Sequence, residues 1–192
     1  MEKKLEGKKV AILVADGFEQ VELTEPKQAL EAAGAITEIV SPADEEVQGW
    51  NHDEKADAFH VDVPLKRARS DDYDALLLPG GVRSPDRLRQ LTRALEFIDG
   101  FFATGKPVAA ICHASWTLIE AGVVDGRRIT SWPSLKTDLR NAGAEWVDRD
   151  VVVDNGLVSS RKPDDIPAFN RKMIDEFAEG RHENGTQFQI GA

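Results

Sequence analysis

Apolar residues along this chain are gathered in short runs, and stretches with a helical spacing of apolar positions lie between them. The run at 10–14 is apolar throughout, which is typical of a strand buried on both faces of a sheet. We expect further strands at 36–40 and 74–78, and one that ends at Ile111. Strands that alternate with helices in this way predict a doubly wound α/β domain with a mostly parallel sheet.

The expected helices separate these strands. The first starts at Thr24 as its cap, has Pro26 in its first turn and ends at Gly34. A later one begins near Asp164 and has a regular apolar stripe. The other helical segments are about 92–104, the stretch from Cys112 to Gly122, and 134–143.

Two parts of the chain interrupt the alternation. The segment 41–55 is polar, with a hairpin tip expected at 50–53, and 58–63 alternates apolar and polar residues like an exposed strand. Further short strands are predicted at 129–131, 146–147, 151–153 and 157–159. We expect a single domain over 8–180, with flexible termini at 1–7 and 181–192.

Composition narrows the classes of partner and compartment. The 192 residues carry a formal net charge of −10, which disfavours nucleic acid or an anionic membrane as partner. No apolar stretch is long enough to span a membrane, and the N-terminus lacks a signal-peptide pattern. A single cysteine forbids an intramolecular disulfide, so we expect a cytoplasmic protein. The four histidines lack the spacing of metal ligands.

The single cysteine, Cys112, stands where a buried strand is expected to turn sharply into a helix. Unpaired N–H groups and the dipole at a helix N-terminus favour a thiolate there, which would make Cys112 a nucleophile. The alternative is a buried cysteine that acts as a small apolar side chain. Two other strand ends are chemically unusual: 16–19 and 79–81. In a doubly wound sheet such ends meet in one crevice, which favours the nucleophile.

The chain contains five unusual motifs: DGFEQVEL at 16–23, LPGG at 78–81, AICHA at 110–114, NAGAEW at 141–146 and SSRKPDD at 159–165. Together they resemble the ThiJ/PfpI family of the class I glutamine-amidotransferase-like superfamily. The resemblance covers most of the chain, from about Lys9 to Phe177. It implies a flavodoxin-like sheet with a short β-hairpin excursion, and neither a metal nor an organic cofactor.

The resemblance also implies a role for each matching residue. Cys112 would be the nucleophile on a strained elbow, and a protonated Glu19 would hydrogen-bond its thiolate. Gly81, preceded by Gly80, would form the oxyanion site with the backbone N–H of His113. From the residues alone, Glu19 could equally be an acid at a helix start, and 80–81 only a tight turn.

The resemblance also implies which residue would orient His113. In the family the equivalent histidine can act as a base oriented by an acid from another subunit, and Asp86 matches that acid here. A helix cap after Ser84 is the competing interpretation of Asp86. The family pattern therefore implies a homodimer or a higher homo-oligomer, in which the loop 81–89 of one subunit faces the Cys112 site of the other. Two residues depart from it or stand out. Ser115 replaces a common proline. Trp132 would narrow the pocket and favour small substrates, and the alternative is that it only packs on the surface.

Three functions from different classes fit this motif set. The first is a stress-protective cysteine hydrolase acting on small reactive carbonyls or their adducts, as a glyoxalase or deglycase does. The second is an intracellular cysteine peptidase. The third is a redox sensor or holdase chaperone that uses oxidation of Cys112 without catalysis. The width of the pocket near Trp132 separates the first from the second.

Overall fold

A computed structural model describes residues 3–182, and its central feature is a mostly parallel sheet. Within those residues seven strands join in the order β11-β12-β8-β7-β1-β3-β6, and the β11–β12 pair alone is antiparallel. The doubly wound α/β fold is therefore confirmed. The strands are β1 (Lys9–Leu13), β3 (Ile36–Ser41), β6 (Val63–Pro64), β7 (Ala75–Leu78), β8 (Val108–Ile111), β11 (Val151–Asp154) and β12 (Leu157–Ser160).

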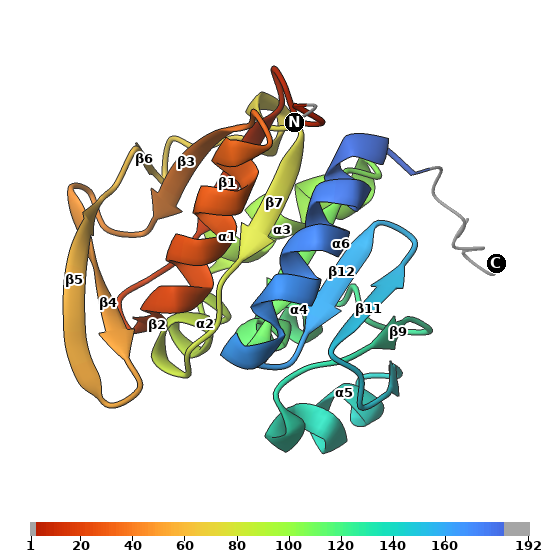
Figure 1. Cartoon of the computed structure of the whole chain (residues 1–192). Coiled ribbons are helices and arrows are strands. Elements are labelled where there is room, and N and C mark those ends of the chain that lie inside the picture. Colours follow the sequence, from red (N-terminus) through yellow and green to blue (C-terminus); the bar gives the residue numbers. More distant parts are fainter. Residues whose placement is uncertain (1–2, 183–192) are drawn as a thin grey trace, which may run out of the picture.

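Helices cover both faces of this sheet (Figure 1). α1 (Gln20–Ala32) and α6 (Ile166–Glu179) lie side by side on one face, and α3 (Thr92–Ala103) and α4 (Ser115–Glu120) lie on the other. The core has two halves, and alternate residues of β1 pack into each of them: Ala11 packs into one half and Ile12 into the other. This alternation follows from the two-residue period of a strand and explains why the run is apolar throughout.

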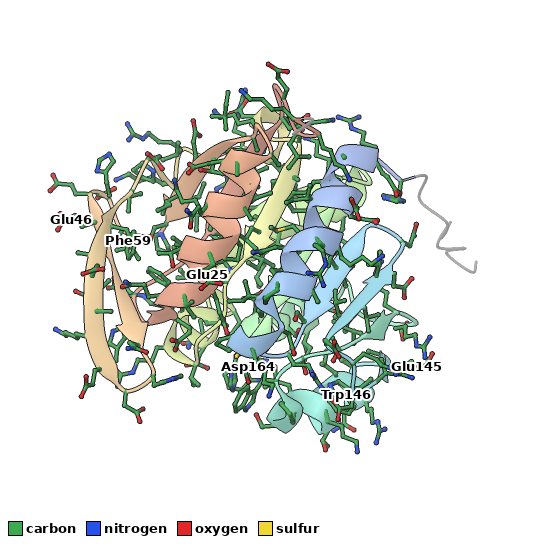
Figure 2. The ribbon with its side chains drawn as sticks, viewed as in Figure 1. Glu25, Glu46, Phe59, Glu145, Trp146 and Asp164 are labelled. Atoms are coloured by element: carbon green, nitrogen blue, oxygen red, sulfur yellow. The ribbon has the colours of Figure 1, made fainter. Side chains whose placement is uncertain are left out.

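Smaller elements surround the sheet. β2 (Phe18–Glu19), β4 (Glu46–Asn51) and β5 (Glu54–His60) form a second sheet, whose hairpin tip at 52–53 lies within the expected range. His60 is exposed, as expected. Acidic side chains such as Glu25, Glu46 and Glu145 lie on the outside of the molecule (Figure 2). The remaining elements are α2 (Arg83–Leu88), β9 (Arg128–Ile129), α5 (Lys136–Asn141), β10 (Glu145–Trp146) and four short 3₁₀ turns.

Three expectations about element boundaries are wrong. The first helix begins at Gln20 rather than Thr24, so Pro26 lies in its interior. The exposed strand expected at 58–63 is β5, which ends at His60. The segment after Gly81, expected as a loop, contains α2. Each error comes from a boundary that tertiary packing, rather than local preference, decides.

The N-terminal boundary of the domain also needs correction. Leu5 is fully buried and its N–H donates to the carbonyl of Ala33, so the chain joins the domain before residue 8. At the other end, His182 N–H donates to the Gly105 carbonyl. The expected flexible residues 183–192 and 1–2 lie outside the described residues. Among residues 3–182, no helix combines the length and apolar character that a membrane span requires.

Candidate active site

Cys112 stands on a strained turn at the carboxyl end of β8. Its φ is 62°, a left-handed value that is rare for a residue other than glycine. The backbone is extended at Ile111 and becomes a 3₁₀ turn at Cys112–Ala114, which leads into α4. Strain of this kind costs about 1–3 kcal/mol and persists only where packing enforces it. The elbow that the family pattern implied is thus present, with the Cys112 side chain nearly buried.

A cavity of about 280 Å³ opens above this turn. Gly17, Gly81 and Cys112 line it, so the ends of β1, β7 and β8 meet as the sequence predicted. The cavity is therefore a crevice at the carboxyl ends of parallel strands, where this class of fold binds ligands. Its other lining residues are Glu19, Glu22, Trp50, His52, Asp53, Val82, Arg83, His113, Trp132 and Pro163.

Backbone N–H groups surround the Cys112 sulfur. Those of Gly81 and His113 act on it and lower the pKa of its thiol, and these are the two donors that the resemblance implied. Gly80 makes this close approach feasible, because a Cβ on it would lie 2.7 Å from the Cβ of Cys112. Two converging N–H groups can stabilise a negative charge on the sulfur or on an oxygen that forms beside it.

The carboxyl group beneath Cys112 belongs to Glu22, which corrects the prediction for Glu19. Glu22 is fully buried, and its Oε2 accepts the N–H of Gly80 at 2.8 Å. The Cys112 thiol lies within reach of the same carboxyl, but Oε1 forms no hydrogen bond of good geometry with any described residue. Burial raises the pKa of Glu22 to about 8, and the nearby Glu19 adds to this. Glu22 is therefore a neutral carboxylic acid at neutral pH.

Glu19 lies at the mouth of the cavity instead. It belongs to β2 and pairs with Trp50 of β4, and this pairing fixes its direction. Its Oε2 accepts the backbone N–H of His52 at 3.1 Å, and the imidazole Nδ1 of His52 is 3.7 Å away. Glu19 thus connects the sheet of β2, β4 and β5 to the cavity.

A helical spacing in the sequence could have identified Glu22. The buried positions Glu22, Pro26 and Leu30 recur every four residues and share the inner face of α1. Placing the start of the helix at Thr24 left Glu22 outside that pattern. An acid on the apolar face of a helix is a strong signal because its burial is costly unless it is neutral or paired.

The ionisation of Cys112 also differs from the expectation. Burial and the neighbouring Glu22 raise the pKa of the thiol well above its ordinary value, and the two N–H groups offset only part of this. The expected lowering by a helix N-terminus is therefore wrong. The turn after Cys112 is a single 3₁₀ turn, and α4 is only six residues long. Cys112 is a thiol at neutral pH, so a base is needed to activate it.

His113 is placed to be that base. Its Nδ1 lies 3.2 Å from the Cys112 sulfur. Burial lowers the pKa of His113 to about 4, so its imidazole is neutral and can accept a proton. The ring stacks on Trp132, with 5.7 Å between ring centroids, and meets the edge of Trp116. Trp116 is half-buried and helps to hold this ring.

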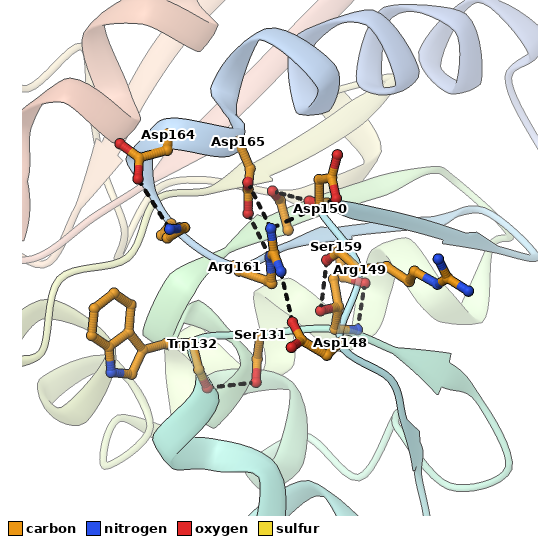
Figure 3. A network of polar contacts seen from close by, with 12 residues as sticks. Ser131, Trp132, Asp148, Arg149, Asp150, Ser159, Arg161, Asp164 and Asp165 are labelled. Carbon is orange, nitrogen blue, oxygen red and sulfur yellow. Dashed lines mark hydrogen bonds and ion pairs between the residues drawn. The ribbon is translucent and has the colours of Figure 1, made fainter.

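Trp132 reaches the site from a separate segment. Its backbone N–H donates to the Cys112 carbonyl at 3.2 Å, and its side chain lines the cavity. The hydroxyl of Ser131 donates to the Trp132 carbonyl (Figure 3). It also accepts the indole N–H of Trp146. These contacts hold the backbone at Trp132, and its indole lines the side of the pocket.

A network of charges centred on Arg161 supports the same edge of the sheet. Its guanidinium forms two hydrogen bonds with Asp165, at 2.8 and 3.0 Å, and one with Asp148 at 2.6 Å (Figure 3). Asp150 is 3.6 Å away. Asp165 and Asp148 raise the pKa of Arg161, and the network ties the 148–150 segment to the start of α6.

Asp86 makes no contact with His113 within the described part of one chain. It lies in the first turn of α2 and is exposed, and its carbonyl accepts an amide proton of Gln90 at 2.9 Å. No described residue hydrogen-bonds Nε2 of His113. The expected orientation of His113 by Asp86 of another subunit therefore stays a prediction.

One cluster in the described residues has the spacing of a metal site, and it lies outside the cavity. Ligand atoms of Glu176, Glu179 and His182 lie within 4.8 Å of one another at the end of α6. His182 Nε2 is 2.8 Å from a carboxylate oxygen of Glu176, so these two side chains are in direct contact. The cavity itself offers one sulfur, one imidazole and a neutral acid around Cys112.

Comparison with known proteins decides the family. The family model described as DJ-1/PfpI matches residues 8–176. The chain belongs to the DJ-1/PfpI family. General stress protein 18 of Bacillus subtilis is 44% identical over 170 residues, which are 88% of this chain and 96% of that protein. YraA of the same organism, a candidate cysteine protease, is 44% identical over 169 residues, covering 88% and 97% of the two chains.

Two further DJ-1/PfpI proteins widen the comparison. A deglycase of Pyrococcus abyssi is 43% identical over 166 residues, covering 86% of this chain and 97% of that protein. The crystal structure of Drosophila melanogaster DJ-1beta has a TM-score of 0.81 at 29% identity, covering 89% of this chain and 90% of that one. The resemblance seen in the sequence is therefore confirmed as membership, and relatives with enzyme names share nearly the whole chain.

Proposed function

We propose that this DJ-1/PfpI protein is a stress-protective cysteine enzyme that acts on small reactive carbonyl compounds or their amine and thiol adducts. The observation that carries the proposal is the contact of 3.2 Å between the Cys112 sulfur and Nδ1 of a neutral His113 inside a small cavity. A nucleophile and a base within hydrogen-bonding reach are the requirement for covalent catalysis. Relatives named as a deglycase and a general stress protein support this choice.

The first step is addition of the thiol to a carbonyl. As the sulfur of Cys112 bonds to the carbonyl carbon, Nδ1 of His113 takes the S–H proton. The carbonyl oxygen becomes an alkoxide, and the N–H groups of Gly81 and His113 stabilise it. The proton then passes from the imidazolium to the alkoxide, which gives a hemithioacetal. A free thiolate is not required, since the proton leaves as the bond forms.

The later steps need no outside oxidant. In the hemithioacetal of a 2-oxoaldehyde, a base moves the proton of the former aldehyde carbon to the neighbouring carbon. This internal transfer oxidises one carbon, reduces the other and leaves a thioester of a 2-hydroxy acid. Water hydrolyses the thioester and restores the thiol of Cys112. The sum is one 2-oxoaldehyde plus one water giving one 2-hydroxy acid, and an amine adduct releases its amine first.

Glu22 supports this chemistry as a neutral acid. Its raised pKa keeps the proton on the carboxyl at neutral pH, so it brings no second negative charge to the sulfur. A neutral carboxyl can also donate a hydrogen bond as charge develops beside it. Its unpartnered Oε1 is the atom that would carry this proton.

The small cavity favours this function over the two others. A volume of about 280 Å³ with Trp132 at its side suits a small carbonyl compound better than a peptide chain. Oxidation sensing favours exposed cysteines of low pKa, whereas burial raises the pKa of Cys112. A protein of this kind would work in the cytoplasm, where a lone thiol stays reduced.

We further propose a homodimer in which Asp86 of one subunit orients His113 of the other. If Nδ1 of His113 accepts the thiol proton, Nε2 carries a hydrogen that needs an acceptor. No described residue of the same chain supplies one, and the exposed Asp86 lies on α2, next to the cavity-lining Arg83. A symmetric pairing would supply that acceptor at both sites.

The experiment is an assay of the purified protein with methylglyoxal, with its amine adducts and with a peptide library. Lactate should form from methylglyoxal with wild type and not with Cys112→Ala. Cleavage of peptides by the wild type at comparable kcat/KM, without lactate formation, would replace this proposal with the peptidase.

A further inference from the structure

Arg83 is a cation held at the mouth of the catalytic cavity. It lines the cavity together with Cys112, and its guanidinium carbon lies 3.9 Å from the centroid of the Trp50 ring. Stacking on an indole face holds a guanidinium in one plane and leaves its N–H groups free at the edges. Those edges are the atoms that bind carboxylates and phosphates in a two-pronged way.

A glycine makes room for the stem of this side chain. A Cβ on Gly17 would lie 2.5 Å from the Cβ of Arg83 and 3.1 Å from its Cδ. Gly17 also has a φ of 87°, so a side chain is excluded there on two grounds. Arg83 is thus packed against Gly17 along its stem and against Trp50 at its head, which reduces the entropy lost on binding a ligand.

The charge of Arg83 is not used within the described part of the chain. No ion pair or hydrogen bond of its guanidinium is formed there, whereas Arg87 on the same helix pairs with Asp16 at 3.6 Å. The acids near the cavity are occupied or neutral: Glu19 accepts the His52 N–H, and Glu22 is protonated at neutral pH. Asp53 lies exposed at the hairpin tip and is the remaining carboxylate of the lining.

We propose that Arg83 binds an anionic group of the substrate, so that the site selects carbonyl compounds and adducts that carry a carboxylate or a phosphate. This inference rests on the proposed function for its reaction, and it names the substrate class of the same site. Arg83 is a specificity-determining residue: it holds the anion at the mouth while the carbonyl faces Cys112 inside the same cavity.

The first test uses two alkylating agents of almost equal size. Iodoacetate is an anion and iodoacetamide is neutral, and both react with the Cys112 sulfur, so the ratio of their rates reports attraction of an anion. We expect Arg83→Gln to lower the ratio of the iodoacetate rate to the iodoacetamide rate about fivefold. This factor is smaller than a buried ion pair would give, because solvent screens the charge of an exposed arginine. Arg83→Lys, which keeps the charge but not the fork, should lower it less.

Arg87→Gln is the matched control. It removes one positive charge from the same helix, and Arg87 does not line the cavity. We expect it to change the ratio less than about twofold, because charges at the exposed surface are screened within roughly 10 Å. Trp50→Leu, which removes the ring under Arg83, should give an intermediate loss. An unchanged ratio in Arg83→Gln, or an equal fall in Arg87→Gln, would overturn the proposal.

A second test connects selectivity to turnover. The hemithioacetals of methylglyoxal with N-acetylcysteine and with N-acetylcysteine amide differ by one carboxylate. Wild type should process the acid with the higher kcat/KM, and Arg83→Gln should abolish the difference. Equal kcat/KM for both adducts in the wild type would overturn the substrate class. No turnover of either, with an alkylation ratio that still responds to Arg83→Gln, would reject the proposed reaction and leave the anion site in place.

Discussion

Arg161 and Cys112 both follow strands at the same end of the sheet, but the polar groups around them are arranged in opposite ways. The register pairs Ser160 of β12 with Ile111 of β8, so Arg161 and Cys112 follow adjacent parallel strands at the same level. Every acid around Arg161 faces its positive charge. Beneath Cys112, the fully buried Glu22 has an oxygen with no partner of good geometry among the described residues.

This difference separates a structural cluster from a reactive one. Paired charges gain by staying ionised, and the Arg161 network accordingly holds two segments together. At the Cys112 site, burial favours the neutral form of each group. It raises the pKa of the Glu22 carboxyl and of the Cys112 thiol, and it lowers the pKa of His113. Groups held neutral near neutral pH can exchange protons with one another and with a substrate, which is the property that catalysis requires.

The largest expected effect is on Cys112 itself. Cys112→Ala should lower the rate of lactate formation about a thousandfold or more, because the covalent step has no substitute nucleophile. Ser115→Ala changes another buried side chain three residues along the same turn and is the control. Residual activity of Cys112→Ala near that of the control would show that the buried thiol is only a packing residue.

The next largest effect is expected at Asp86, and it tests whether the acid that orients His113 comes from a second subunit. Asp86→Ala should lower kcat about 10- to 100-fold without unfolding the domain, by analogy with residues that orient a metal-bound histidine. Asp99→Ala, a change of another acid that lies on α3, should leave kcat unchanged. Light scattering that reports a monomer with full activity at micromolar concentration would remove Asp86 from the site.

The third effect is the pH dependence of stability. The pKa of Glu22 is raised to about 8 in the fold, so the unfolded chain loses that proton first and stability falls as the pH rises from about 4.5 to 8. The pKa of His113 is lowered to about 4, so stability falls as the pH drops from about 6.5 to 4. The two slopes oppose each other below pH 6.5, and that of Glu22 acts alone above it.

Urea unfolding of wild type and Glu22→Gln checks this balance. Between pH 6.5 and 8 the wild type should lose about 2 kcal/mol of unfolding free energy relative to the variant, at about 1.4 kcal/mol per pH unit for one proton. Parallel curves for the two proteins over this range would mean that Glu22 is ionised in the fold.

The smallest effect on activity is expected at Arg161. Arg161→Met should lower the free energy of unfolding by about 2 kcal/mol, since it leaves the nearly buried Asp165 unpaired, and should change kcat/KM less than about twofold. Lys27→Met breaks an exposed helical pair with Glu31 and should cost less than about 0.5 kcal/mol. A large loss of activity in Arg161→Met at full stability would erase the distinction between the two clusters.

The sequence was sufficient for the layers of the fold and for the elbow. Apolar runs such as 10–14 must be buried on both faces, and this alone requires helices on each side of a parallel sheet. The convergence of Gly17, Gly81 and Cys112 followed from the rule that parallel strands end at one edge. These features depend on period and order, which a sequence states directly.

The contacts within the site depended on details that the sequence leaves open. The choice between Glu19 and Glu22 depends on where α1 begins, and that start is set by the pairing of β2 with β4. The contact of His113 with Cys112 depends on backbone and side-chain torsions within the 3₁₀ turn at Cys112–Ala114, which the sequence does not state. The pKa of the thiol depends on burial, which outweighs a short helix.

The pH dependence of Cys112 alkylation tests the central claim most directly. The account holds that Cys112 is a buried thiol activated by a neutral His113 over a protonated Glu22. The rate of iodoacetamide labelling should therefore rise with a midpoint above the value of about 8.5 for a free thiol. Glu22→Gln, which removes the second acid, should move that midpoint down. A wild-type midpoint well below 8.5 would show a resting thiolate and would contradict the account.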